Sequence, residues 1–296
     1  MEKISPFQVE VHGEHTGSVN CMALSTDGNI LVTGSDDCSV RIWTTTTAST
    51  RCLAELRGHE KYITCVAIEE NYVISGSADK SIRKWEMSTG TCLFVYHGHA
   101  GMINRLICTP EVIISSSYDT TVRCWLLDPV VDPNESHEAC VRVFRGHHKS
   151  VYPIIFVPAE EDDGDNEPDI PEDMVISGSG DGTARAWSME TGKQVAVFRG
   201  HSGPVNAMAI QTDGKVLFTG SADKTIRSWD VIKGEQIRLF EGHEQPITAL
   251  LVYKTLLFSA SADRTVRSWV IEFGDHARTF RGHKHSVSCL THSKGI

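Results

Sequence analysis

The sequence predicts an all-β protein made of repeated four-stranded antiparallel sheets. A Gly-His pair or a close equivalent recurs along the chain, and each repeat carries four short segments rich in β-branched and aromatic residues. No stretch has helical periodicity of useful length. The recurring histidines stand 44, 40, 48, 54, 42 and 40 residues apart: His15, His59, His99, His147, His201, His243 and His283.

The four segments of each repeat follow one order. A first strand comes after the histidine, as in "VNCMAL" (19–24), and a second ends in small and hydroxyl residues. A third strand follows an Asp and closes on Trp, as in "SADKSIRKW" (77–85). A fourth, such as "KQVAVFRGH" (193–201), leads to the next histidine. Gly, Asp and Asn between these runs mark the turns.

Composition limits the class of protein. A chain of 296 residues, 40% of them hydrophobic, can bury a sizeable core, and no run reaches eighteen apolar residues. The first ten residues have no secretory signal pattern. The nine cysteines form no C-x-x-C pair, and several lie in apolar runs, which predicts reduced thiols in the cytoplasm, with the nucleus as the alternative. The net charge of −10 argues against nucleic acid as a partner.

Repeats of this length that begin with Gly-His and contain Asp-x-Ser/Thr-x-Arg-x-Trp resemble WD40 repeats. The resemblance recurs six times and covers essentially the whole chain, although the literal Trp-Asp pair occurs once, at Trp229 and Asp230. It implies a single β-propeller domain over residues 1–296, with six complete four-stranded blades and an incomplete seventh. The seventh unit, "RGHKHSVSCLTHSKGI" (281–296), stops where its second strand would begin, so we expect a truncated chain.

The resemblance also implies a hydrogen-bonded tetrad in each blade, formed by the histidine, a Ser or Thr, the turn Asp and the Trp. The Ser or Thr lies four residues before the Asp and the Trp six after it. The six sets are His15, Thr33, Asp37 and Trp43; His59, Ser75, Asp79 and Trp85; His99, Ser115, Asp119 and Trp125; His147, Ser177, Asp181 and Trp187; His201, Thr219, Asp223 and Trp229; and His243, Ser259, Asp263 and Trp269.

Ser, His and Asp together also suggest a hydrolase. An enzyme, however, needs one activated nucleophile in one pocket, whereas these residues recur in all six repeats. We therefore predict a structural role for the tetrads, no catalytic residues, no metal and no cofactor. The Arg two residues before each Trp receives the same interpretation, since i and i+2 share a strand face.

The fourth repeat departs from the pattern. Its histidine and Asp are 34 residues apart, against 20 or 22 in the other repeats. The excess is an acidic loop insert, Pro158–Asp173, with nine carboxylates and no Lys or Arg. The insert is either a solvated loop or a docking segment for a Lys/Arg-rich partner. The predicted docking residues are Glu160, Glu161, Asp162, Asp163, Asp165 and Glu167.

In WD40 propellers, partner contacts often come from the third and fifth residues after the histidine and from the residue before the turn Asp. At these positions the second to fourth repeats carry three of the six tyrosines and a methionine. Such side chains are frequent anchors of protein interfaces. The predicted partner-binding residues are Tyr62, Thr64, Met102, Asn104, Tyr118, Ser150 and Tyr152.

These features predict a non-catalytic scaffold or adaptor that binds other proteins or peptides on one propeller face. The alternative is the substrate-recognition subunit of a ubiquitin ligase complex. That role usually needs an F-box or a Trp-Asp-x-Arg signature, and Trp229 is followed by "DVI". We expect no membrane, nucleic-acid or small-molecule partner.

Overall fold

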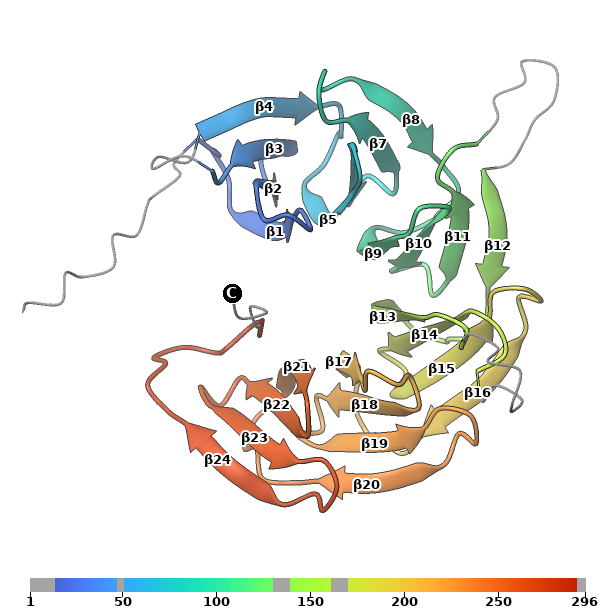
Figure 1. Cartoon of the computed structure of the whole chain (residues 1–296), viewed down its shortest axis with the longest axis vertical. Coiled ribbons are helices and arrows are strands. Elements are labelled where there is room, and N and C mark those ends of the chain that lie inside the picture. The colour runs from blue at the N-terminus through green and yellow to red at the C-terminus, as the bar shows by residue number, and fades with distance from the viewer. Residues whose placement is uncertain (1–13, 47–50, 130–138, 161–169, 292–296) are drawn as a thin grey trace, which may run out of the picture. The chain divides into compact units, whose positions relative to one another are not determined.

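The computed structural model describes residues 14–46, 51–129, 139–160 and 170–291. These residues form 24 β-strands and no helix, so none of them belongs to a helix that could cross a membrane. The strands make six four-stranded antiparallel sheets, which confirms the predicted fold class of six complete blades. In each sheet the strands lie side by side in chain order (Figure 1).

The strand bounds follow the predicted order of each repeat. The first three sheets are β1 (Val19–Leu24), β2 (Ile30–Ser35), β3 (Ser39–Thr44) and β4 (Arg51–Arg57); β5 (Ile63–Glu69), β6 (Tyr72–Ser77), β7 (Ile82–Glu86) and β8 (Cys92–Tyr96); and β9 (Ile103–Cys108), β10 (Val112–Ser117), β11 (Val122–Leu126) and β12 (Cys140–Phe144). The other three are β13 (Val151–Val157), β14 (Met174–Ser179), β15 (Thr183–Ser188) and β16 (Gln194–Arg199); β17 (Val205–Ile210), β18 (Val216–Ser221), β19 (Ile226–Asp230) and β20 (Gln236–Phe240); and β21 (Ile247–Tyr253), β22 (Leu256–Ser261), β23 (Val266–Val270) and β24 (His276–Phe280).

The chain divides into two compact units. The first contains the described residues of Met1–Ile113 and Leu126–Ala139, and the second those of Ile114–Trp125 and Cys140–Ile296. Sheets β1–β4 and β5–β8 therefore belong to the first unit, and sheets β13–β16, β17–β20 and β21–β24 to the second. The boundary runs through the third sheet.

Neighbouring sheets within a unit bury their apolar faces against each other. In the first unit, Ile42 of β3 and Trp85 of β7 belong to one buried cluster. In the second unit, Phe198 of β16 and Trp229 of β19 do the same, with ring centroids 5.8 Å apart. Each fully buried large side chain of this kind contributes roughly 1.5–3 kcal/mol. This packing accounts for the predicted core.

Two bulges recur in the sheets. The first lies in the fourth strand, opposite the Trp: Ile42 pairs with Ala54, but Trp43 pairs with Cys52, which leaves Leu53 unpaired. Leu93, Val195 and Ile237 are unpaired in the same way and, like Leu53, are exposed. The second bulge lies in the first strand, where the ladder skips one residue: Asn20, Thr64, Asn206 and Thr248.

Residues 281–291 follow the sixth sheet and form no strand. Val287 is nevertheless buried, and its backbone N–H donates to the carbonyl of Ser261 at the end of β22. The hydroxyl of Thr248 donates to the carbonyl of Val287. The segment is thus attached to the sixth sheet through backbone and side-chain hydrogen bonds.

Candidate protein-interaction surface

In five repeats the turn Asp belongs to a hydrogen-bonded set with the composition that the sequence predicts. In the second repeat, His59 Nδ1 lies 2.7 Å from Asp79 Oδ2 and His59 Nε2 lies 2.8 Å from Ser75 Oγ. Trp85 Nε1 donates to the same Ser75 Oγ at 2.8 Å. The first, fourth, fifth and sixth repeats contain the same three hydrogen bonds. In the third repeat Trp125 donates to Ser115, and His99 belongs to the other unit.

The chemistry of these groups determines where the protons lie. The indole N–H can only donate, so the Ser75 oxygen accepts from Trp85, and the same oxygen lies 2.8 Å from His59 Nε2. The Asp79 carboxylate can only accept, so His59 donates to it from Nδ1. Burial raises the pKa of Asp79, but hydrogen bonds from His59 and Ser81 outweigh it and hold that pKa well below its usual value. Burial lowers the pKa of His147, His201 and His243.

Like the nucleophile of a hydrolase, the Ser75 hydroxyl has a histidine partner, but a substrate cannot reach it. Ser75 is completely buried, and its hydroxyl oxygen also accepts a hydrogen bond from the Trp85 N–H. A substrate carbonyl cannot reach it without removing the indole. This geometry supports the structural interpretation of the tetrad.

The glycine of the Gly-His pair makes room for the repeated Arg and Trp. A Cβ atom on Gly58 would lie 2.6 Å from Nη1 of Arg83 and 3.2 Å from the ring of Trp85. Gly146, Gly200 and Gly242 approach the Arg and Trp of their own repeats in the same way. The guanidinium of Arg83 lies 5.8 Å from the Trp85 ring centroid, which fits the predicted packing role of this Arg.

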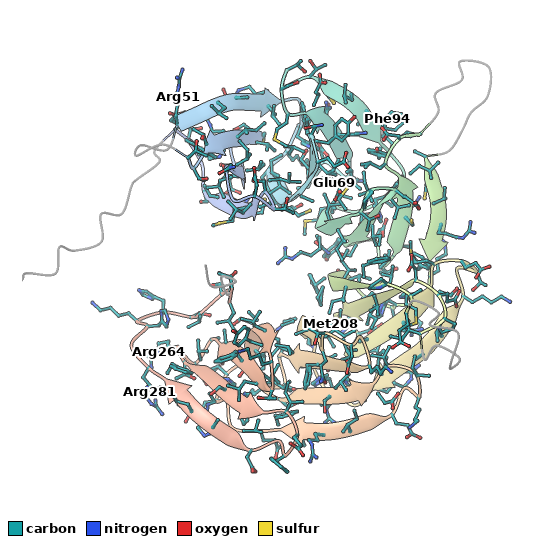
Figure 2. The ribbon with its side chains drawn as sticks, viewed as in Figure 1. Arg51, Glu69, Phe94, Met208, Arg264 and Arg281 are labelled. Carbon is teal, nitrogen blue, oxygen red and sulfur yellow. The ribbon has the colours of Figure 1, made fainter. Side chains whose placement is uncertain are left out.

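These sets hold the turn between the second and third strands in one conformation. The residue after the Asp has a positive φ there, as at Lys80, Thr120, Lys224 and Arg264, the last labelled in Figure 2. The residue before the Asp therefore stands at a fixed place beside this turn. Tyr118 occupies that place in the third repeat and is 56% exposed.

Tyr118 belongs to a shallow depression of about 380 Å³ in the second unit. The residues around it, which we call the Tyr118–Tyr152 depression, are Tyr118, Thr120, Lys149, Ser150, Tyr152, Gly180 and Pro204. Tyr152 is 38% exposed, and its carbonyl accepts a 2.8 Å hydrogen bond from the Ser116 hydroxyl, which secures its backbone. Ser150 lines the depression but is itself buried.

The polar side chains that line this depression can all donate hydrogen bonds. Its lining offers the ammonium group of Lys149 and the hydroxyls of two tyrosines, a serine and a threonine, and no carboxylate. The nearby Asp181 points inward, where its Oδ2 binds His147 and its Oδ1 accepts from Thr183. Sequence reasoning missed Lys149 because it stands two residues after the histidine, outside the positions that the family resemblance singled out.

The predicted partner-binding residues of the first unit do not line the Tyr118–Tyr152 depression. Tyr62 is 40% exposed, and its hydroxyl lies 3.5 Å from the sulfur of the half-buried Met102. The half-buried Thr64 donates to the carbonyl of Gly76 in its own sheet. Asn104 is 8% exposed. Because the seven predicted residues are divided between the two units, a single continuous patch stays a prediction.

The fifth residue after the histidine often has an internal partner. It lies in the bulge of the first strand, so its side chain can reach the next sheet. Asn20 Nδ2 donates to the Ile63 carbonyl at 3.0 Å, and Asn206 Nδ2 donates to the Ile247 carbonyl at 3.2 Å. This role connects neighbouring sheets and explains why the position is polar in most repeats.

The acidic insert is attached to the protein at both ends. Glu160 forms an ion pair with Lys215 at 3.2 Å, and its backbone N–H donates to the Ile170 carbonyl at 2.8 Å. Ile170 is 1% exposed and packs in the core cluster of the fourth and fifth sheets. The other five predicted docking residues, Glu161, Asp162, Asp163, Asp165 and Glu167, lie outside the described residues. Sequence reasoning did not anticipate the anchoring role of Ile170.

Comparison with solved structures reveals similar architectures, among them a designed protein. A computationally designed protein called Ika8 matches with a TM-score of 0.78 and 27% sequence identity, over 95% of this chain and 79% of the designed one.

Among natural proteins, the WD repeat-containing protein pop1 of Schizosaccharomyces pombe is 27% identical over 252 residues, which are 71% of this chain and 30% of that protein. A guanine nucleotide-binding protein subunit beta of Arabidopsis thaliana is 30% identical over 178 residues, 55% of this chain and 42% of that protein. The chain therefore spans less than half the length of these two relatives.

The family model for the WD domain, G-beta repeat, matches residues 7–44, 50–86, 90–125, 192–230 and 234–269. The match omits the fourth repeat, whose acidic insert interrupts it, but Trp187, Ser177, His147 and Asp181 make the same hydrogen bonds there. The chain belongs to the WD40 repeat family.

Proposed function

We propose that the chain is a non-catalytic protein-interaction scaffold, and that the Tyr118–Tyr152 depression receives a segment of a partner protein. The observation that carries the proposal is the pair of exposed tyrosines around one hollow, Tyr118 before the turn Asp and Tyr152 in β13. Tyrosines of this kind bury a large area at low conformational cost, as anchor residues of interfaces do. The WD40 family membership supports a role in binding proteins.

The lining favours a partner segment that brings hydrogen-bond acceptors. Lys149 and the hydroxyls can donate to main-chain carbonyls or to a carboxylate, while the faces of Tyr118 and Tyr152 accept apolar atoms. An acidic side chain beside an apolar one would satisfy both requirements. This part of the surface therefore differs in charge from the acidic insert.

The test fills the depression without disturbing the turn. Gly180 stands before the turn Asp, where the third repeat has Tyr118, so its backbone conformation accepts a tyrosine. A Cβ there would lie 3.4 Å from the nearest atom, Lys149 Cβ, which is ordinary contact. Gly180→Tyr should reduce partner recovery at least about tenfold, the loss expected for removing a hot-spot contact. Ala222→Tyr, the same change in the fifth repeat, is the matched control.

Recovery is measured by proximity labelling and mass spectrometry on the full chain. Partners found with the unmodified chain and with Ala222→Tyr should disappear with Gly180→Tyr and with Tyr118→Ala/Tyr152→Ala. An identical set of partners for all four chains would contradict the proposal. Thermal unfolding of each variant checks that the chain is still folded.

A Lys/Arg-rich partner for the acidic insert is a separate proposal. Removing residues 161–169 and joining Glu160 to Ile170 through a short glycine linker keeps both anchors, because their backbones are already hydrogen-bonded. The deletion should abolish a salt-sensitive interaction and leave others intact. Partner recovery that is unchanged at low salt would reject a docking role for the insert.

We further propose an intracellular location, which the nine free cysteines support. The alternative function, a ubiquitin-ligase substrate receptor, stays a prediction. Ubiquitin-ligase subunits among the labelled proteins would favour it.

A further inference from the structure

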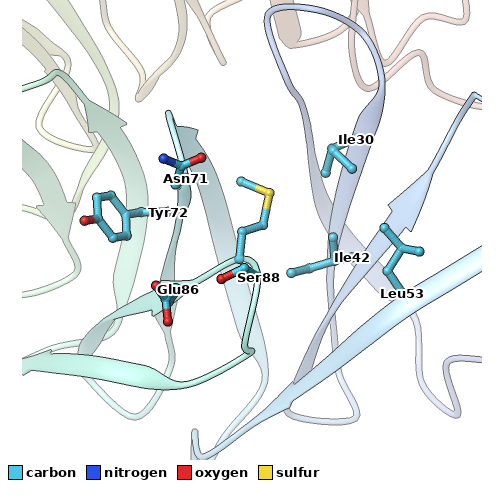
Figure 3. Close-up of a pocket in the computed structure, with 8 residues that line it drawn as sticks. Ile30, Ile42, Leu53, Asn71, Tyr72, Glu86 and Ser88 are labelled. Atoms are coloured by element: carbon cyan, nitrogen blue, oxygen red, sulfur yellow. The ribbon is translucent and has the colours of Figure 1, made fainter.

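A second hollow, of about 450 Å³, lies in the first unit between sheets β1–β4 and β5–β8. Figure 3 shows Ile30, Ile42 and Leu53 on one side and Asn71 and Tyr72 on the other, with the Tyr72 ring pointing away from the two isoleucines. Ile42 is buried, whereas Leu53, the unpaired residue of the β4 bulge, is 53% exposed. We call this hollow the first crease.

The strand next to Ile42, a lining residue of the first crease, carries a small side chain opposite it. Ile42 pairs with Ala54 across the strands. At the equivalent place in the second sheet, Lys84 pairs with Phe94, the larger residue labelled in Figure 2. There Lys84 Nζ and the Tyr96 hydroxyl both donate to the carbonyl of Leu127, at 3.3 and 2.8 Å. The chain therefore occupies that crease with its own residues.

The crease between the fourth and fifth sheets is occupied in a different way. Ile170 comes from the acidic insert and packs there in one buried cluster with Met174, Ala186 and Val231. Its backbone is held by Glu160, whose N–H donates to the Ile170 carbonyl and whose carboxylate lies 3.4 Å from the Ile170 nitrogen. An aliphatic side chain from outside the two sheets thus completes this crease.

The repeat pattern relates the two creases residue by residue. Ile42 and Ala186 directly precede the Trp of their repeats, and Met87 and Val231 follow the next Trp by two residues. Both members of the second pair donate to the carbonyl eight residues before the turn Asp, Met87 to Asn71 and Val231 to Lys215. Met87 lines the first crease. No other segment of the described chain enters that cavity as Ile170 enters its own.

The first crease is also lined by polar residues. Their side chains can bind the backbone of an inserted segment, as Glu160 binds the backbone of Ile170. Glu86 is the single charged residue around the hollow. Its carboxylate accepts one hydrogen bond, from Thr89, and keeps capacity for another donor. The side chains of Asn71 and Ser88 also border the hollow and have no hydrogen-bond partner in the described part of the chain.

We propose that the first crease is a docking site for an extended segment of a partner protein, which inserts one aliphatic side chain and carries a Lys or Arg beside it. The aliphatic residue takes the place that Ile170 takes between the fourth and fifth sheets, and the cation pairs with Glu86. This site is independent of the Tyr118–Tyr152 depression.

The probe is a synthetic peptide, acetyl-GSKIPSG-amide, added to the full chain labelled with ¹³C in the methyl groups of Met and Ile. The resonances of Met87, Ile30 and Ile42 should shift and saturate, with a dissociation constant of roughly 0.1–1 mM for one buried aliphatic anchor. The peptide with Asn in place of Ile should cause no shift. Absence of shifts up to the solubility limit of the first peptide would overturn the proposal.

Two variants make the test specific. Ser88→Trp covers the hollow and should weaken binding at least tenfold, about 1.4 kcal/mol, while Ile232→Trp, at the equivalent place in the fifth repeat, should not. Glu86→Gln should weaken the binding of the Lys peptide about threefold. It should leave unchanged the binding of a peptide with Ser in place of Lys. Shifts that persist in Ser88→Trp would place the peptide elsewhere and reject the site. Tyr118→Ala/Tyr152→Ala should bind the peptide normally, which separates this site from the proposed scaffold function.

Discussion

Nη1 of Arg41 lies 2.9 Å from Oε2 of Glu14, which stands where the second, fourth, fifth and sixth repeats have a glycine against the guanidinium. Two solutions to one packing problem therefore exist in the chain. Either the backbone has no side chain and the Arg lies against it, or the side chain carries a charge that pairs with the Arg.

Placing a side chain at Gly58 and removing the side chain of Glu14 should change the stability of the protein by different amounts. Gly58→Ala places a Cβ 2.6 Å from Arg83 Nη1 and 3.2 Å from the Trp85 ring, at a φ of +159°, so we expect a loss of about 1–3 kcal/mol in the free energy of unfolding from overpacking and backbone strain. Glu14→Gly should change it by less than about 0.5 kcal/mol, because Arg41 keeps its ion pair with Glu55 at 3.0 Å. Urea unfolding of the two variants measures the contrast, and equal losses would contradict the packing explanation.

Anchoring of the acidic insert should be visible in stability. Ile170→Ala removes a 1% exposed side chain from the cluster of the fourth and fifth sheets, and we expect a loss of about 2–4 kcal/mol. Ile232→Ala, at a residue 43% exposed, is the control and should cost less than about 0.5 kcal/mol. Similar urea midpoints for the two variants would mean that Ile170 does not secure the insert.

The strands and the tetrads were predictable because each repeat encodes them in adjacent residues. The Asp, the hydroxyl residue and the Trp keep fixed offsets, and the short-range pattern survives even the insert of the fourth repeat. The proposed interaction surface was less predictable. Lys149 has no repeated counterpart with a known role, and Ile170 lies within an acidic stretch that is typical of solvated loops. Ser150 and Asn104 were predicted as contact residues, but three-dimensional packing buries both.

The turn after each Asp gives a prediction about backbone strain. Thr120 adopts φ +74° and Gly182, at the equivalent place, adopts φ +81°. A β-branched residue is strained in this left-handed region, so Thr120→Gly should stabilise the chain by about 0.5–1 kcal/mol. Gly182→Thr should destabilise it by about 1–2 kcal/mol, and its Cβ would also lie 3.0 Å from the His201 carbonyl. Thermal unfolding measures both, and effects of the same sign would be inconsistent with a strain mechanism.

The tetrads should make the protein sensitive to acid in two stages. Burial lowers the folded-state pKa of His147, His201 and His243 below the ordinary 6.5, so the unfolded chain takes up protons first as pH falls through 6.5. The Asp pKa values are also lowered, to about 2 for Asp263, so the stability that these carboxylates contribute above pH 3.8 is lost as pH falls toward 2.

The expected profile is a constant urea midpoint above pH 7, a decline that begins near pH 6.5, and a steeper decline below pH 4. His148→Gln is the control, because His148 is exposed and its side chain is not part of the tetrad hydrogen bonds. It should leave the profile unchanged. A midpoint that rises between pH 7 and pH 5 would show that the histidines are charged in the folded protein.

A buried lysine replaces the small or apolar residue that precedes the Trp in the other repeats. Lys84 is 2% exposed, lies 3.7 Å from the Tyr72 ring centroid and forms an ion pair with Asp128. Asp128→Ala leaves the ammonium group without its counter-ion and should cost about 1–2 kcal/mol. In a Lys84→Met background the same change should cost less than about 0.5 kcal/mol, because no buried charge is left to compensate. The double-mutant cycle measured by urea unfolding gives the coupling directly, and additive effects would show that the ion pair contributes nothing.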